Sequence, residues 1–295
     1  MSTSFTPERW AFDITHVLNA AFGTDRFPID ISMVAHEYSK QRFPDDPIVS
    51  VKGDNLPTFD GALFRIPVGR KGWAIIYNDA IVSKGRINFT LAHEFGHYLI
   101  HRLVYPNGFR CGQQQIVRWD SEYGQVEHQA NVFAANLLMP LDDFRRQIPA
   151  NAKVDFEMLR ACASRYKVSL IAAVLRWLSY TDKRAILVVS RDGFILWSRS
   201  SELAWRTGAF FKTSAGPIEI PSSSLPLNPR LLVDGRGEAD HAPSVWLREA
   251  AHEMTILAEY YDFSLSLLLL DDARPYFSEA KAEEDTYDRS LVSGT

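Results

Sequence analysis

Residues 91–98 read Leu-Ala-His-Glu-Phe-Gly-His-Tyr, and this stretch decides which folds the chain can adopt. Residues four positions apart lie on one face of an α-helix, so His93 and His97 point the same way and can bind a single ion. Neutral imidazole nitrogens bind zinc at about 2.0–2.1 Å, and a catalytic zinc site keeps one position open for water. The stretch therefore predicts a helix that carries two metal ligands.

Glu94 directly follows the first of these predicted ligands. From there its carboxylate can reach a metal-bound water and accept its proton as the water attacks a peptide carbonyl. Two surface histidines beside an ordinary glutamate are the simpler alternative. The apolar residues of this segment, however, recur with helical spacing: Ile87, Leu91, Phe95 and Leu99. We therefore expect a buried active-site helix with Glu94 as the general base.

A third protein ligand has to come from another part of the chain. His101 follows His97 by four residues, but a helix rises about 6 Å over that distance, which carries His101 away from the ion. We expect it at the surface or beside a ligand. A metzincin would need glycine and histidine further along the helix, where this chain has Ile100 and Leu103. That class of metallopeptidase is excluded, and a glutamate on a following helix remains.

Residues 127–139 show helical spacing, end before a proline, and begin with Glu127. Asn131 lies four residues later, so it shares a face with Glu127 and can hydrogen-bond a ligand histidine. Asp120 and Glu122 are competing carboxylates in a stretch that predicts a loop. We expect one zinc ion per chain. The predicted ligands are His93, His97 and Glu127.

The remaining pattern predicts an α+β protein. Helical spacing and N-cap residues predict helices at 7–21, 31–40, 84–102, 156–166 and 170–180. Short apolar or β-branched segments between turn residues predict strands at 48–51, 62–66, 73–77, 185–189, 194–197, 254–260 and 263–270. Residues 212–244 are rich in Pro, Ser and Gly and predict a long loop.

Length and composition narrow the function classes. A chain of 295 residues is long enough for about two domains. A net charge of −4 without a long Lys/Arg block argues against direct nucleic-acid binding. Two cysteines are too few for a disulfide framework, which fits a reducing cytoplasm. The chain has no apolar run long enough to predict a membrane span, and the N-terminus shows no secretory signal. We expect a cytoplasmic protein that binds no membrane.

Three further features leave alternatives open. The helices at 156–166 and 170–180 have the spacing of a helix-turn-helix, but the second carries one charge, Arg176. A DNA-reading helix needs several polar and basic side chains, so the pattern predicts that this helix is a core or interface element.

The strand at 62–66 could offer an exposed edge to an extended substrate. Candidate donors to a tetrahedral oxyanion are Tyr98, Tyr123, His101 and His128, and the sequence does not choose among them.

Two segments together resemble the ImmA/IrrE family of metallopeptidases. They are Phe89-Thr-Leu-Ala-His-Glu-Phe-Gly-His97 and Glu127-x-x-Ala-Asn-x-Phe-Ala-Ala-x-Leu-Leu-Met-Pro140. Asp60-Gly-Ala62 and Ile75-Ile-Tyr-Asn78 resemble strands of the same family. The resemblance covers about residues 30–180. It implies a minimal zincin core of the glutamate type, with zinc on His93, His97 and Glu127 and with Glu94 catalytic.

The resemblance also implies a role. Members of the family are cytoplasmic peptidases that cleave a partner repressor of the XRE type and so switch on stress-response or mobile-element genes. A non-proteolytic regulator that sequesters a repressor, or a toxin–antitoxin component, are the alternatives, and the intact Glu94 favours the enzyme. The expected organisation is a peptidase domain at 1–150, a helical segment at 151–182, a sensor-like α+β domain similar to GAF folds at 183–277, and a disordered tail at 278–295.

Overall fold

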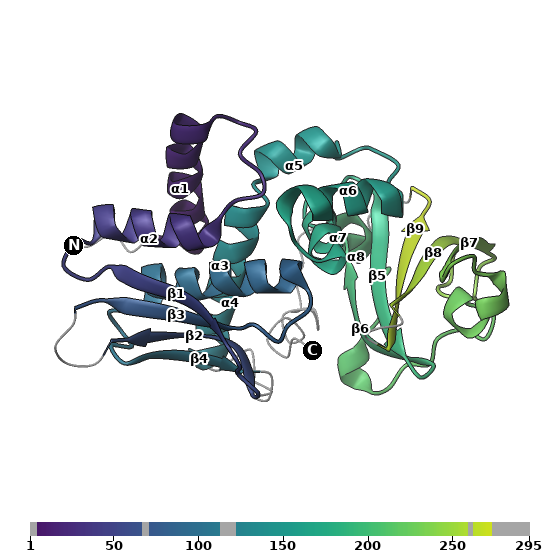
Figure 1. Ribbon diagram of the computed structural model, residues 1–295. Coiled ribbons are helices and arrows are strands. Elements are labelled where there is room, and N and C mark those ends of the chain that lie inside the picture. Colours follow the sequence, from purple (N-terminus) through teal and green to yellow (C-terminus); the bar gives the residue numbers. More distant parts are fainter. Residues whose placement is uncertain (1–4, 67–70, 113–121, 259–261, 273–295) are drawn as a thin grey trace. The chain divides into compact units, whose positions relative to one another are not determined.

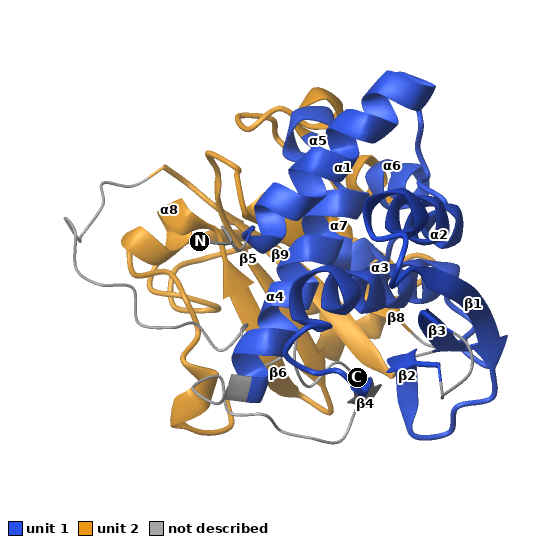
Figure 2. Cartoon of the chain, turned by 90° about the vertical axis from the view of Figure 1, so that its left-hand side faces the viewer, with its two compact units in different colours: residues 1–144, 161–172, 291–295 blue, residues 145–160, 173–290 orange. Residues whose placement is uncertain are grey.

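The computed structural model describes residues 5–66, 71–112, 122–258 and 262–272, with backbone alone at 109–112 and 122 (Figure 1). It is an α+β structure with two sheets, as predicted. The chain divides into two compact units (Figure 2). Unit 1 comprises Met1–Phe144, Ala161–Ala172 and Leu291–Thr295, and unit 2 comprises Arg145–Arg160 and Ala173–Ser290. The tail expected to be disordered, from residue 278, lies outside the described residues.

Unit 1 contains a four-stranded sheet with the order β1-β3-β2-β4. Its strands are β1 (Ile48–Asp54), β2 (Phe59–Arg65), β3 (Trp73–Asn78) and β4 (Gly108–Gly112). The pair β1–β3 is parallel, and β2 is antiparallel to both of its neighbours. Three of these strands were predicted, whereas β4 was not. Because β2 lies between β3 and β4, the expectation of an exposed edge at 62–66 is wrong.

Among the described residues, unit 1 holds four complete helices, and a side-chain cap marks the start of three of them. They are α1 (Pro7–Phe22), α2 (Ile31–Arg42), α3 (Lys84–His101) and α4 (Glu122–Leu138). Thr6, Asp30 and Ser83 each accept a hydrogen bond from the backbone N–H three residues later, at the starts of α1, α2 and α3. The helix α4 starts five residues before the predicted position. The loop expected around Glu122 is therefore wrong at that residue, because Glu122 already opens the helix.

Three more helices, α5 (Leu141–Gln147), α6 (Phe156–Tyr166) and α7 (Leu170–Leu178), follow, and the boundary between the units runs through all of them. The short α5 was not predicted. The turn between α6 and α7 lies in unit 1 and contacts the first turns of α3. There the Asn88 side chain donates to the backbone carbonyl of Lys167 over 3.2 Å. In α7, Arg176 and Trp177 are buried, which agrees with the prediction of a core or interface helix.

Unit 2 contains a five-stranded antiparallel sheet with the order β6-β5-β9-β8-β7. Its strands are β5 (Arg184–Arg191), β6 (Phe194–Ser200), β7 (Arg236–His241), β8 (Ala251–Ala258) and β9 (Phe263–Leu270), and a short helix α8 (Glu202–Arg206) follows β6. Asp192 and Gly193 both have positive φ in the β5–β6 turn, as the Arg-Asp-Gly sequence predicts for a hairpin. The strand β7 falls within 212–244, so the expectation of a continuous loop there is wrong.

One face of this second sheet buries a carboxylate. Leu268 lies opposite both Ile186 and Glu253 in the strand ladder, so the three side chains share a face and a core. The Glu253 side chain is fully buried there. A buried charge is costly unless it is hydrogen-bonded, so this carboxylate requires hydrogen-bond donors around it.

Candidate metal centre

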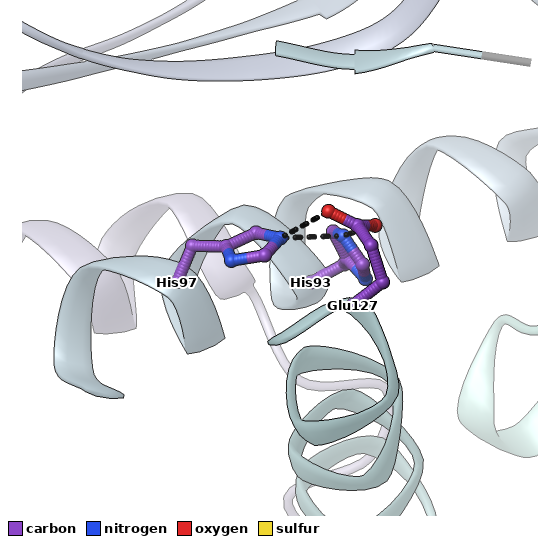
Figure 3. Close-up of side chains that lie close together, drawn as sticks. All are labelled: His93, His97 and Glu127. Atoms are coloured by element: carbon purple, nitrogen blue, oxygen red, sulfur yellow. Dashed lines mark hydrogen bonds and ion pairs between the residues drawn. The ribbon is translucent and has the colours of Figure 1, made fainter. Parts of the chain in front are cut away.

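His93 and His97 lie one turn apart on α3 and face Glu127 on α4 (Figure 3). The two Nε2 atoms are 2.9 Å apart. Glu127 places one carboxylate oxygen 3.2 Å from Nε2 of His93 and the other 3.3 Å from Nε2 of His97. Ligand atoms at about 2.0–2.1 Å from a tetrahedral zinc ion lie about 3.3 Å from one another. The spacing of the three side chains therefore fits a single zinc ion.

A close crossing of α3 and α4 brings Glu127 to the histidines. Gly96 lies at this crossing, where an added Cβ would come within 2.9 Å of the Phe133 ring and 3.3 Å of the Ala130 Cα. The rings of Phe95 and Phe133 meet edge to face with centroids 5.7 Å apart. Both are fully buried, and burial of such a side chain contributes about 1.5–3 kcal/mol. The glycine within the histidine motif thus allows the approach that completes the ligand set.

The neighbours of the histidines direct both Nε2 atoms at the same point. Nδ1 of His93 donates to Oδ1 of Asn131 over 2.9 Å, as the sequence led us to expect. Nδ1 of His97 lies 3.1 Å from Nδ1 of His101. With a proton on each Nδ1, the lone pair of each Nε2 is directed towards the other Nε2 and towards the Glu127 carboxylate. Acceptors that converge in this way require a cation among them.

The pKa values indicate which cation is held before a metal binds. Burial disfavours a charge on His93, but the Glu127 carboxylate outweighs it and raises the pKa of His93 to about 9. Burial and the charge of His93 lower the pKa of His97 to about 4. Burial acts to raise the pKa of Glu127, but the two facing histidines, protonated His93 above all, bring that pKa well below its usual range. A proton on His93 therefore pairs with the Glu127 carboxylate, and a metal ion can replace that proton.

Glu94 is fully buried on the same helix, and its charge acts to raise the pKa of His93. The strand β2 passes close to it at Gly61. An added Cβ at Gly61 would lie 2.9 Å from Oε1 of Glu94 and 2.5 Å from Cγ2 of Thr90. Gly61 was not among the predicted site residues. A glycine within a strand is a signal of close backbone approach, so Asp60-Gly-Ala62 could have revealed it.

A comparison with family models matches residues 45–178 to the IrrE N-terminal-like domain of the M78 peptidases. The match contains all three candidate ligands and Glu94. Residues 45–178 belong to the ImmA/IrrE family. The resemblance seen in the sequence is confirmed. A search among curated proteins finds no match.

ImmA/IrrE proteins are metallopeptidases, and the buried His-His-Glu group suits such a role. Among the residues whose placement is described, this is the one group of three or more His, Cys, Asp or Glu side chains that could hold a metal ion, with its ligand atoms within 4.8 Å of one another. The competing Asp120 lies outside the described residues, as does the side chain of Glu122. No helix in the described part of the chain is long and apolar enough to cross a membrane.

The other sequence candidates around the ImmA/IrrE motif have different surroundings. His101 stands beside His97 and is not part of the ligand group, as expected. The hydroxyl of Tyr98 donates to the backbone carbonyl of Asp46 over 2.7 Å, and its ring packs against Trp73. Tyr98 is therefore a core residue and not an oxyanion donor. Tyr123 is half-buried near the start of α4.

Proposed function

We propose that the protein is a zinc-dependent endopeptidase in which His93, His97 and Glu127 hold the metal and Glu94 is the general base. The proposal depends on one observation, which is the convergence of two imidazole nitrogens and one carboxylate on a buried point. The donor set suits zinc, since imidazole nitrogen and carboxylate oxygen are both ordinary zinc ligands. The arrangement of α3 and α4 beside a small sheet supports a minimal zincin core.

Each side chain has a task in peptide hydrolysis. A bound zinc ion would supply a Lewis acid that acidifies a water molecule and polarises the peptide carbonyl. Glu94 would accept the proton of that water and pass it to the departing amine. The close approach of Gly61 restricts the Glu94 carboxylate to one region beside the motif. Asn131 would hold the ring of His93 in orientation by accepting the hydrogen bond from Nδ1.

The substrate we propose is a DNA-binding repressor of the XRE type, in a pathway that responds to stress in the cytoplasm. The family resemblance is what supports this part of the proposal. We further propose a peptidase domain at 1–150, a helical segment at 151–182 and a sensor-like domain at 183–277. Support for the last comes from the five-stranded antiparallel sheet and the long segment at 201–235 that connects β6 to β7.

The test is co-expression of the chain with the repressor encoded beside its gene. Wild type should remove the full-length repressor, whereas Glu94→Gln should slow cleavage by about 10²–10⁴-fold because it removes the general base. Glu37→Gln is the matched control, since Glu37 is an exposed helical glutamate of unit 1. Both variants should retain zinc. Equal repressor levels with wild type and Glu94→Gln would contradict the peptidase and favour sequestration.

A further inference from the structure

His101 lies between a candidate metal ligand and the helix that supplies the third one. Its side chain is buried at 4% exposure, although it stands in the last turn of α3. Nδ1 of His101 is 3.1 Å from Nδ1 of His97, and Nε2 of His101 is 2.9 Å from Oε1 of Gln129. Both ring nitrogens are therefore used in contacts within the fold. His97, His101 and Gln129 form one chain of hydrogen bonds that starts behind the metal site.

The direction of this chain follows from the atoms at its far end. The side-chain oxygen of Gln129 can only accept, so Nε2 of His101 must carry the proton. A neutral imidazole has one protonated nitrogen, which leaves a lone pair on Nδ1 of His101. That lone pair accepts the proton on Nδ1 of His97. The metal-facing Nε2 of His97 is then left with its own lone pair, which is the form that binds zinc.

We propose that His101 and Gln129 are positioning residues that fix the tautomer and the ring orientation of His97; this inference rests on the proposed zinc site. The helix α4 supplies hydrogen-bond acceptors for both candidate ligand histidines. Asn131 on α4 reaches His93 directly, whereas Gln129 reaches His97 through the ring of His101. One element thus provides the third ligand and the hydrogen-bond acceptors behind the other two.

The experiment compares His101→Leu with His101→Asn in the full-length protein. Leucine fills much of the space but accepts no hydrogen bond, so zinc binding should weaken by about 10–100-fold, the usual cost of losing a partner of a ligand histidine. Asparagine can place its oxygen near the former Nδ1, so it should restore affinity to within a few-fold of wild type. The readout is the zinc dissociation constant, measured by competition with a chelating dye, together with the melting temperature without metal.

A second measurement addresses the tautomers directly. Long-range ¹H–¹⁵N spectra of zinc-loaded wild type should show His97 protonated at Nδ1 and His101 protonated at Nε2. A proton on Nδ1 of His101 would overturn the proposal, because that nitrogen could not then accept from His97. Residues that act only by packing would not set this pattern.

The outcomes separate this proposal from the peptidase proposal. Wild-type zinc affinity in His101→Leu would overturn the positioning role alone. Equal losses of zinc affinity and of melting temperature in both variants would also overturn it, since they would indicate a packing role. Failure of the wild-type protein to bind zinc would overturn the metallopeptidase and the positioning role together.

Discussion

Each unit of the protein buries a histidine against a glutamate, and the two pairs are built for different ends. In unit 1, Glu127 faces His93 and His97 with nitrogen–oxygen distances of 3.2 and 3.3 Å. In unit 2, Nε2 of His241 lies 2.6 Å from Oε2 of Glu253. Both glutamates are buried. Burial and pairing with histidine are therefore common to both, and neither property marks a functional site.

The difference lies in the other groups around each carboxylate. Glu253 accepts hydrogen bonds from Nε1 of Trp246, from the hydroxyls of Thr255 and Ser266, and from the backbone N–H of Leu225. These donors are fixed parts of the fold, and they offset the cost of burying the charge. At Glu127 the facing atoms are the Nε2 atoms of two imidazole rings. The Nδ1 atom of each ring already contacts another side chain, which is Asn131 for His93 and His101 for His97. Hydrogen-bond donors around a carboxylate stabilise the fold, whereas acceptor atoms that converge on one point form a site for a cation.

Removal of one histidine from unit 1 should produce the largest effect on zinc. His97→Ala takes away one of three ligands, so zinc binding should weaken by more than about 100-fold, beyond the loss typical of an outer partner. Competition with a chelating dye measures this. His36→Ala is the matched control, because His36 is a half-exposed histidine on α2. Unchanged zinc affinity in His97→Ala would remove the proposed ligand set.

The corresponding change in unit 2 should alter stability and not zinc. His241→Ala leaves the buried Glu253 charge without its closest partner, which should cost roughly 3–5 kcal/mol. Urea unfolding of the zinc-loaded protein, followed by far-UV circular dichroism, measures the loss. His241→Gln keeps an N–H donor and should recover part of it. A weaker zinc affinity in His241→Ala would show that the two clusters do not differ as we infer.

The pH dependence of zinc binding should test the cluster of unit 1 next. The pKa of His93 is raised to about 9, so at pH 7 its ring carries a proton that must leave when zinc binds. Apparent zinc affinity should therefore rise by about tenfold per pH unit as the pH approaches 9, and then level off. Calorimetry in two buffers of different ionisation enthalpy should record the release of about one proton. A pH-independent affinity between 6.5 and 8.5 would contradict the protonated pair.

Much of unit 1 could be predicted from sequence because its signals are local. The spacing of His93 and His97 specifies a helix face, and Glu127 begins a helical repeat that ends at a proline. β4 and β7 escaped prediction for opposite reasons. β4 is a short strand that starts at Gly108, with a positive φ, whereas β7 has charged residues at alternate positions along a sheet edge. The apolar alternation of β4 covers only Phe109–Cys111, and β7 has small or charged residues throughout, so neither strand has the longer apolar alternation that reveals a half-buried strand.

Contacts between distant segments could not be predicted in the same way. The sequence predicted His101 either at the surface or beside a ligand. In the structure His101 lies beside the candidate ligand His97, and its other ring nitrogen contacts Gln129. The register that brings them together depends on the crossing of α3 and α4 at Gly96. For Glu253, no local motif connects it with His241, twelve residues earlier on another strand. Such pairings follow from the packing of elements and not from spacing along one of them.

The smallest effect we expect concerns Gly61, which separates catalysis from zinc binding within unit 1. In Gly61→Ala the new methyl group would press on Thr90 and on the Glu94 carboxylate, so cleavage should slow by about tenfold, less than the roughly 100-fold that a 1 Å misplacement of a catalytic group can cost. Zinc affinity should stay within a few-fold, because the methyl group approaches Glu94 rather than the ligands. Adding Thr90→Ser removes the methyl carbon that lies 2.5 Å from the new Cβ and should restore part of the rate. Full activity in Gly61→Ala would mean that the position of Glu94 is set by α3 alone, and that the strand above it takes no part in the chemistry.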